Sequence, residues 1–260
     1  SAIGMMLFTS RPVGDAMATT IWGTSSSWTL TALPLFVWMG EILFRTRLSE
    51  NLFKGLSPWM QKLPGGLIHV NVVGCALFAA ISGSSAATVA TVGKMSIPEL
   101  RKRNYPEKIL LGSLAGSGTL GLLIPPSIIL IIYGVAVQES IAKLFIAGIL
   151  PGIMIALIFM SYVIFWSLIN KKQMPKIIEE YSIFEKIKRS KQLLPVIFLI
   201  SAVIGSIYTG IATATEAASL GVVGALILSY FQKSLTLETF KTSLLGATKT
   251  SCMIAFILAG

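Results

Sequence analysis

Long apolar stretches alternate with short charged segments along the whole chain. A helix needs roughly 20 consecutive apolar residues to cross a bilayer. The candidate membrane spans are residues 28–44, 144–169, 193–210, 211–231 and a last one that begins near Thr250. An amphipathic segment, residues 234–249, precedes the last span. This pattern predicts an all-α polytopic membrane protein.

Two further apolar stretches are interrupted by small residues and by proline. Residues 66–93 are rich in Gly and Ser. Residues 109–137 contain Gly116-Ser117-Gly118-Thr119, followed by Pro125-Pro126. Because proline removes a helical N–H donor, the second stretch is expected to be a broken helix.

The composition supports a membrane protein. Of 260 residues, 54% are apolar and 12% are charged, and the mean hydropathy is +0.79. Since a soluble domain has about 25% charged residues, a soluble globular or disordered protein is excluded. The two cysteines, Cys75 and Cys252, lie in apolar stretches, and there is one histidine. Neither a disulfide framework nor a Cys/His metal site is therefore expected.

The charges predict which segments face the cytoplasm. The net charge of +10 comes from 21 basic and 11 acidic residues, and sixteen of the basic ones lie in residues 45–64, 94–108 and 170–192. Cytoplasmic loops carry an excess of Lys and Arg, so these three segments should be cytoplasmic. Residues 136–143, which hold one acid and one base, should face the other side. In a soluble protein this net charge would suggest nucleic-acid binding, but here topology accounts for it.

The segment at residues 66–93 is predicted to be a re-entrant helical hairpin. It lies between two predicted cytoplasmic segments, and its 28 residues are too few for two spans at about 1.5 Å rise per residue. Its tip should fall near residues 81–85, where small polar residues interrupt the apolar pattern. Two capping-box patterns, one starting at Ser96 and one at Ser182, predict short cytoplasmic helices.

The two predicted interruptions form the candidate site. Non-helical backbone inside a membrane is tolerated only where it is buried in protein or lines a wet cavity. Half-helix ends then offer carbonyl groups and dipole ends for a sodium ion or a carboxylate. Hydroxyls, close backbone approach and freed carbonyls come from Ser82, Ser84, Ser85, Gly118, Gly121, Pro125 and Pro126. The alternative is that small residues only permit tight packing, which suits Gly112-x-x-x-Gly116 and Gly148-x-x-x-Gly152.

Two acids, Glu41 and Glu216, lie within apolar stretches and are functional candidates by default. Each also has a structural explanation. Glu41 precedes Arg45 by four residues, the spacing of a helical ion pair. Glu216 suits the first turn of a helix, with Thr213 or Thr215 as the cap. The single histidine, His69, is better explained as a hydrogen-bonded interfacial side chain than as a proton carrier.

Several segments, spread over most of the chain, match a known family in the same order. They are LPGGLIHVNV (63–72), FAAISGSSAA (78–87), GTLGLLIPPS (118–127) and LFIAGILPG (144–152), with shorter matches PLF (34–36), GE (40–41) and TEAA (215–218). Taken together, they resemble the large membrane subunit of tripartite ATP-independent periplasmic (TRAP) transporters, the DctM-like family.

The resemblance implies an elevator-type secondary transporter, similar to the ion-transporter superfamily, in which a mobile domain carries substrate and sodium past a fixed scaffold. It implies a sodium site formed by Ser82 and Ser84 with backbone carbonyls around Gly121, Ile124 and Pro126. The further candidates for the transport site are Ser85, Gly118, Thr119, Pro125, Glu41, Thr215 and Glu216.

The resemblance also implies a division of the chain. Residues 1–65 would be scaffold and arm helices, and residues 144–231 would be scaffold spans with a cytoplasmic connector at 170–192. The first half of the transport domain would be residues 66–135, with the hairpin at 66–93, a cytoplasmic helix at 96–108 and the broken helix at 109–137. Residues 232–260 would start the second half, whose own hairpin should lie beyond residue 260. We therefore expect the chain to be part of a longer transporter.

The function implied by the resemblance is sodium-coupled import of an organic acid, a C4-dicarboxylate or another carboxylate, across the inner membrane of a bacterium or archaeon. The implied partners are a periplasmic substrate-binding protein and a small DctQ-like membrane subunit. Two alternatives are a different ion-coupled secondary anion transporter and a channel or scaffold subunit. An enzyme is not expected, because one histidine and no intramembrane Asp provide neither a nucleophile–base pair nor a metal cluster.

Overall fold

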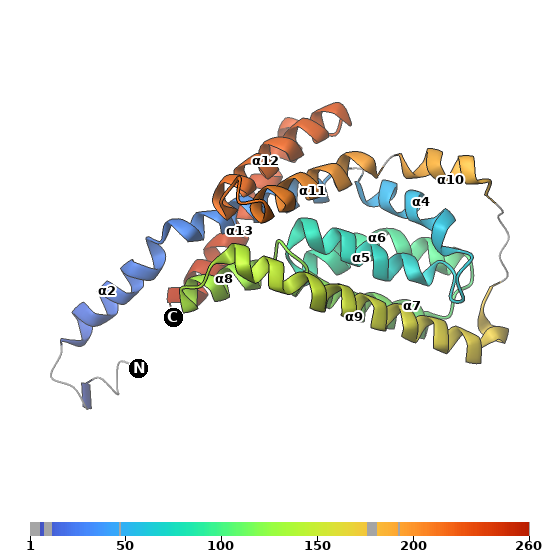
Figure 1. Cartoon of the computed structure of the whole chain (residues 1–260), viewed down its shortest axis with the longest axis horizontal. Helices are drawn as coiled ribbons and strands as arrows, with labels where there is room; N and C mark the ends of the chain where they lie inside the picture. Colours follow the sequence, from blue (N-terminus) through green and yellow to red (C-terminus); the bar gives the residue numbers. More distant parts are fainter. Residues whose placement is uncertain (1–5, 8–11, 47, 176–180, 192, 260) are drawn as a thin grey trace.

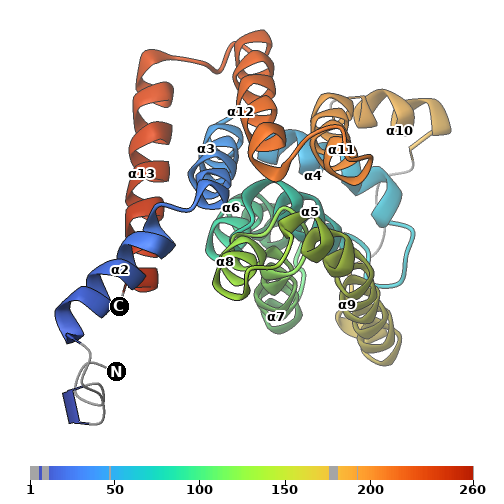
Figure 2. The same cartoon turned by 60° about the vertical axis from the view of Figure 1, so that its left-hand side comes forward.

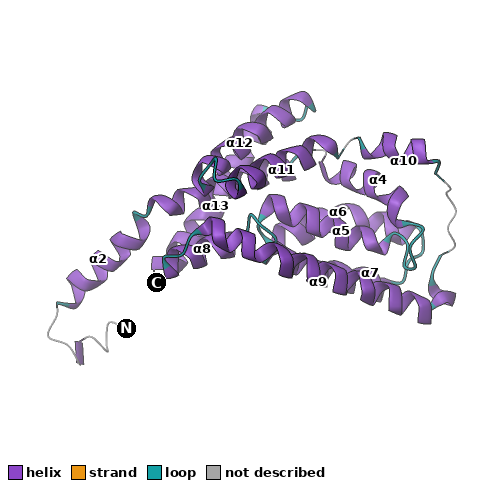
Figure 3. Ribbon diagram, in the orientation of Figure 1, coloured by secondary structure: helices purple, strands orange, loops and turns teal. Residues whose placement is uncertain are grey.

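The computed structural model describes residues 6–7, 12–46, 48–175, 181–191 and 193–259, and all regular elements in these ranges are helices (Figure 3). The first elements are α2 (Val13–Ser25), η1 (Trp28–Thr31), α3 (Ala32–Phe44), α4 (Leu48–Met60), α5 (Ile68–Ser82), α6 (Ser85–Lys102), α7 (Glu107–Gly118), η2 (Thr119–Leu122) and α8 (Ile128–Val137). They are followed by α9 (Ile141–Ile169), η3 (Lys171–Gln173), α10 (Ile183–Ser190), α11 (Leu194–Tyr208), α12 (Ala214–Phe231) and α13 (Leu237–Ala259). The predicted all-α fold is confirmed.

Among the residues that the structure describes, two helices are long and apolar enough to cross a membrane, α9 with 29 residues and α12 with 18. Two pairs of helices, each bent at a short break, give two further spans if each pair is counted as a single span. These pairs are α2 with η1 and α3, bent by 51°, and α10 with α11, bent by 58°. The helices α5 and α8 are apolar but shorter, with 15 and 10 residues. Their lengths are too short for full spans.

Helices α5 and α6 form the predicted hairpin and lie side by side in both views (Figures 1 and 2). The chain reverses at Gly83 and Ser84, within the predicted tip. Gly83 has a φ of +57°, in the left-handed region that glycine adopts without a steric penalty. The Ser84 hydroxyl accepts a hydrogen bond from Ala87 N at 3.5 Å and caps α6. The small residues at the tip thus end one helix and start the next.

Helix α6 is longer than the sequence pattern predicts. The capping-box pattern at Ser96 does not start a new helix, because α6 continues through Pro98 to Lys102. The buried positions of α6 lie on both sides of the proline: Thr88, Thr91, Val92, Gly93, Ser96 and Leu100. Packing of this single face against α5 and α7 keeps the helix continuous, so the separate helix predicted at residues 96–108 is wrong. The capping box at Ser182, in contrast, is present at the start of α10.

Helix α13 also combines two predicted elements. The amphipathic segment at residues 234–249 and the span from Thr250 form one helix, in which no proline interrupts the hydrogen bonding. Helix α13 packs on α3, where Trp38 Nε1 donates to Ser243 Oγ at 3.2 Å. The rings of Trp38 and Phe240 meet edge to face, with centroids 5.7 Å apart.

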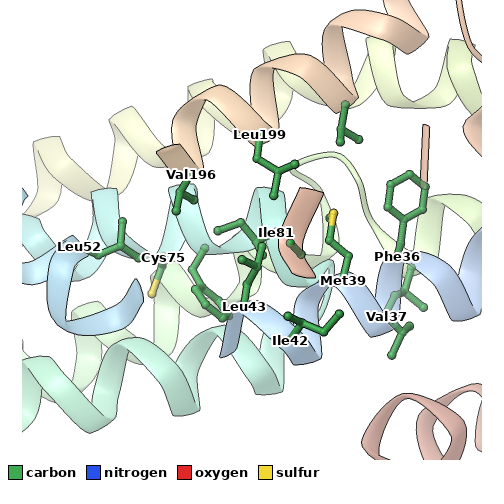
Figure 4. Close-up of a cluster of buried hydrophobic side chains, with 14 of the residues drawn as sticks. Phe36, Val37, Met39, Ile42, Leu43, Leu52, Cys75, Ile81, Val196 and Leu199 are labelled. Atoms are coloured by element: carbon green, nitrogen blue, oxygen red, sulfur yellow. The ribbon is translucent and has the colours of Figure 1, made fainter. Parts of the chain in front are cut away.

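Helix α3 lies at the centre of the main hydrophobic cluster (Figure 4). Its buried side chains include Phe36, Val37, Met39, Ile42 and Leu43, and they pack with residues of α5, α12 and α13. Gly40 lies so close to the end of α5 that a Cβ there would be 3.0 Å from Ser82 Cα. Helix α3 thus supports the hairpin tip directly.

A buried polar contact joins the hairpin to α7. Asn71 Nδ2 donates to the Leu110 carbonyl at 3.2 Å and to Ser113 Oγ at 3.0 Å. Ser117 Oγ lies 3.4 Å from the Asn71 carbonyl, to which it donates. Such bonds are strong in an apolar interior, and an unpaired group there would be unfavourable. We therefore expect the hairpin and α7 to behave as one rigid unit.

The fit of the hairpin tip can be tested at Gly83. A Cβ at this position would lie 2.6 Å from the Pro126 carbonyl oxygen, and an alanine would also have an unfavourable φ. Gly83→Ala should lower the free energy of unfolding by about 1–3 kcal/mol. Thermal unfolding of the purified full-length protein in detergent would measure this change. Gly112→Ala is the matched control, because within the described residues no atom of a neighbouring segment lies within 4 Å of its Cβ position. Equal stability of the two variants would contradict the close contact.

Candidate functional site

The hairpin tip contacts the break in the helix that follows it. Ile128 N, at the start of α8, donates to the Gly83 carbonyl at 3.3 Å. A Cβ on Gly121 would lie 2.8 Å from Ser84 C and from Ser85 N, so only glycine allows this approach. The structure thus contains both predicted interruptions and brings them together. The break itself starts later than predicted, because α7 continues to Gly118.

The broken helix leaves several carbonyl groups without helical donors. The Pro125–Pro126 peptide bond is cis, and neither proline has an N–H to offer to the carbonyls of Gly121 and Leu122, one turn earlier. Ser127 Oγ compensates at one of them by donating to the Leu122 carbonyl at 2.6 Å. In the described part of the chain, no hydrogen bond reaches the carbonyl oxygens of Gly121, Ile124, Pro125 and Pro126. These oxygens have lone pairs available for a ligand.

The hydroxyl groups of the tip form a small network. Ser82 Oγ lies 2.9 Å from Thr88 Oγ1 and 3.2 Å from the Ser84 carbonyl oxygen. That carbonyl also accepts from Thr88 Oγ1 at 2.7 Å. Ser85 Oγ is buried and makes no hydrogen bond within the described residues. Sequence reasoning did not identify Thr88 as a member of this cluster. The signal that could have found it is its position one helical turn after Ser84, which places its hydroxyl at the tip.

The arrangement suits a small, hard cation. Its oxygen atoms come from backbone carbonyls and from serine and threonine hydroxyls, and a buried Ser85 hydroxyl is unpartnered. Ca²⁺ sites commonly include carboxylates, which the tip and the break do not contain. Helices α6 and α8 both begin at this contact, and helix N-termini carry a positive partial charge. An anionic group of a substrate would be favoured beside them.

Two candidate residues have structural roles close to the tip. A Cβ on Gly118 would lie 1.9 Å from Val89 Cγ2, so this glycine allows α7 to pack closely on α6. The Thr119 hydroxyl donates to the Gly116 carbonyl at 2.7 Å, within its own turn, and Thr119 is exposed. Neither residue contributes a side-chain oxygen atom to the network formed by the tip hydroxyls.

Glu41 forms the ion pair with Arg45 that its spacing allows. Arg45 also donates to the carbonyl and the hydroxyl of Thr242 on α13, each at 3.1 Å. A Cβ on Gly246 would lie 2.7 Å from Glu41 Oε2, so the carboxylate lies against the backbone of α13. The contacts of Glu41 thus match the helical ion pair that the sequence spacing predicts, and together with Arg45 they join α3 to α13.

Glu216 completes a capping box at the start of α12. Its carboxylate accepts from Thr213 N and Thr213 Oγ1, each at 2.8 Å, and Thr213 is therefore the cap. Glu216 and Thr215 line an open pocket of about 910 Å³, together with Trp28 and Glu139. The pocket is formed by the ends of η1, α8, α9 and α12, which the predicted topology places on the side away from the cytoplasm.

The remaining sequence candidates are explained by packing. His69 is fully buried and its Nε2 lies 2.8 Å from the Pro64 carbonyl oxygen. A Cβ on Gly148 would lie 2.8 Å from the Leu123 carbonyl oxygen, and one on Gly152 would lie 2.9 Å from Ile124 Cγ1. This glycine pair thus lets α9 pack directly on the helix break, as the packing alternative predicts. In the Gly112–Gly116 pair, a Cβ on Gly116 would lie 3.0 Å from Phe159 Cε1 of α9, whereas the Cβ position of Gly112 meets no neighbouring segment among the described residues within 4 Å. The packing alternative therefore holds for Gly116 and not for Gly112.

Comparison with known proteins assigns the chain to a family. Residues 1–260 match the family model described as "Tripartite ATP-independent periplasmic transporter, DctM component". The C4-dicarboxylate TRAP transporter large permease protein DctM of Pseudomonas aeruginosa is 34% identical over 259 residues, which cover 99% of this chain and 60% of the relative. The sialic acid TRAP transporter large permease protein SiaM of Vibrio cholerae is 31% identical over 262 residues, with 100% and 60% covered.

A third relative is the isethionate TRAP transporter permease protein DctMQ of Oleidesulfovibrio alaskensis, which is 32% identical over 254 residues. That match covers 96% of this chain and 39% of the relative. The chain spans about 60% of the length of the first two relatives. The predicted family is thus confirmed: the chain belongs to the DctM component family of tripartite ATP-independent periplasmic transporters, which are membrane permeases and not enzymes.

Proposed function

We propose that the chain is part of the permease subunit of a sodium-coupled TRAP transporter that imports an organic acid across the inner membrane. The observation that carries the proposal is the contact between the hairpin tip and the helix break. Carbonyls that accept no hydrogen bond within the described residues lie there beside the tip hydroxyls, of which Ser85 Oγ is unpartnered. Sodium prefers hard oxygen ligands, and non-helical backbone at membrane depth is otherwise unfavourable. The family membership supports transport as the activity.

Sodium would be held by the Ser82 and Ser84 groups and by the backbone carbonyls of Gly121, Ile124 and Pro126. The carbonyls of Gly121 and Pro126 accept no hydrogen bond in the described residues and lie beside the tip. Because the cation would contact both the hairpin and the broken helix, its binding would stabilise their contact. The N-termini of α6 and α8 would then favour an acidic group of the substrate nearby. Ion and substrate would thus each strengthen binding of the other.

The substrate class is proposed from the relatives. Their names specify C4-dicarboxylate, sialic acid and isethionate, all of which carry an acidic group. A carboxylate such as a C4-dicarboxylate is the substrate that we favour. The other partners would be a periplasmic substrate-binding protein and a small DctQ-like membrane subunit, and a relative named DctMQ supports the second.

The motion would be of the elevator type. The hairpin and α7 are joined by the buried Asn71 bonds, which favours their movement as one body. The long helix α9 contacts the helix break through Gly148 and Gly152, which let it pack closely on Leu123 and Ile124. Helices α9, α11 and α12 would belong to the fixed scaffold.

Sodium-driven uptake should be measurable in proteoliposomes. The full-length protein, its small membrane subunit and its binding protein should accumulate the labelled acid only when an inward sodium gradient is present. Uptake should saturate with substrate, because alternating access limits the rate, whereas a channel would not saturate in this way. Uptake that continues unchanged after the sodium gradient is collapsed would reject sodium coupling.

The hydroxyls of the tip can be tested by sodium dependence. Replacing both Ser82 and Ser84 by Ala should raise the sodium concentration for half-maximal uptake about tenfold, which corresponds to about 1.4 kcal/mol of lost binding. Ser161→Ala is the matched control, because that exposed hydroxyl donates to the Leu157 carbonyl of its own helix. If the double variant and the control share the wild-type sodium response, the two serines are not sodium ligands.

A further inference from the structure

The short helix α10 exposes its apolar side chains. Ile183, Phe184 and Ile187 have exposed fractions of 73%, 76% and 49%. These positions lie within about one turn of each other and form one side of the helix. A helix on the surface of a soluble protein would turn such a side toward the core. The exposure therefore indicates that an apolar medium or a partner covers this side.

The contact with α4 fixes the orientation of α10. Trp59 Nε1 donates to Ser190 Oγ at 2.8 Å, and Ser190 Oγ donates to the Gly55 carbonyl at 3.3 Å. Lys186 Nζ lies 5.5 Å from the centroid of the Trp59 ring. Helices α4 and α10 are neighbours in both views (Figures 1 and 2). Because α10 uses polar side chains for this contact, its apolar side chains stay outside, and Trp59 itself is 47% exposed.

Basic side chains surround this apolar surface. Residues 183–191 contain Lys186, Lys188, Arg189 and Lys191 against the single acid Glu185. The Glu185 carboxylate accepts from Ser182 N at 3.1 Å, so it is engaged at the start of the helix. Exposed isoleucine and phenylalanine beside several basic residues are typical of a helix that lies on an anionic membrane surface. A nucleic acid or an acidic protein would match the charge but not the apolar side chains.

The direction of α10 supports this placement. It is bent by 58° from α11, which continues the chain as an apolar helix. If α11 runs across the membrane, α10 lies closer to the membrane plane than to its normal. The four basic residues exclude α10 from the hydrocarbon core. The connector that contains it is also one of the three basic segments expected on the cytoplasmic side.

We infer that α10 and Trp59 form a binding surface for anionic phospholipids of the cytoplasmic leaflet. Ile183, Phe184 and Ile187 enter the boundary between head groups and acyl chains. Lys188, Lys191 and the neighbouring basic residues contact the lipid phosphates, and the Trp59 ring lies at the interface, where tryptophan is enriched. The contact holds the connector of the scaffold against the membrane. This inference does not depend on sodium coupling or on the identity of the substrate.

Lipid quenching of a fluorophore on α10 tests the inference. The full-length protein carries Phe184→Cys labelled with bimane, in a variant that has no other accessible cysteine, with Cys252→Ser included. It is reconstituted with phosphatidylcholine and phosphatidylglycerol, and brominated acyl chains are placed on one lipid at a time. Brominated phosphatidylglycerol should quench the label more strongly than brominated phosphatidylcholine at equal content.

Charge variants show whether the preference comes from α10. Each lysine removed in Lys188→Gln/Lys191→Gln should lower the preference for phosphatidylglycerol about fivefold, which corresponds to about 1 kcal/mol. Lys171→Gln/Lys172→Gln, in η3, is the matched control with the same change in charge and should keep the preference. Lys188→Arg/Lys191→Arg should also keep it, which separates loss of charge from loss of folding.

Three results would overturn the inference. One is no quenching by either lipid, which would place α10 in water. Another is equal quenching by both lipids in every variant, which would leave no preference for anionic lipid. The third is loss of quenching when the small membrane subunit is added, which would make this surface a protein interface.

Discussion

The backbone hydrogen bonds of the hairpin tip and the helix break are the constraint on which the rest of this structure depends. Peptide groups that leave a helix inside a membrane need other partners, because the hydrocarbon offers none. Two segments that leave a helix meet here, and Ile128 N donates to the Gly83 carbonyl. Ser127 serves the carbonyl of Leu122 within the break. Within the described residues, the carbonyls of Gly121, Ile124, Pro125 and Pro126 accept no hydrogen bond, and all four belong to this break.

Close backbone packing follows from this constraint. The tip reaches the break only because Gly83 and Gly121 have no side chain at the contact. Gly40 lets α3 pack against the end of α5 at the tip, and Gly148 lets α9 pack against the carbonyl of Leu123 in the break. The glycines of four separate segments therefore allow one compact contact, which larger residues would force apart. The Asn71 bonds hold the bases of the hairpin and α7 together at a distance from the tip.

Charged groups are used mainly outside this contact. Glu41 and Arg45 join α3 to α13. Glu216 caps α12 beside the open pocket that Trp28 and Glu139 also line. An ion bound at the tip would thus be coordinated by neutral oxygens, whose partial charges compete weakly with water. We regard such a site as suited to an ion that must be released again in each transport cycle. The basic side chains of α10 would have a different role, because they would hold the scaffold connector at the membrane surface.

The sequence by itself determined two of the helix interruptions, because the glycine and the prolines there act on their own backbone. The tip at Gly83 and the break around Pro125 and Pro126 could both be predicted, as could the capping box at Ser182. The apolar stretches determined the all-α membrane class, and the order of the motifs determined the family.

Only the tertiary structure decided which groups meet. It kept α6 continuous through Pro98, since one buried face extends across that residue, and it joined α13 into one helix. It brought Gly121 of the break against the backbone of Ser84 and Ser85 at the tip. It also placed the ion pair of Glu41 and Arg45 against the backbone of α13, where Arg45 donates to Thr242. These outcomes depend on contacts between distant segments, and such contacts leave no periodic pattern along a single chain.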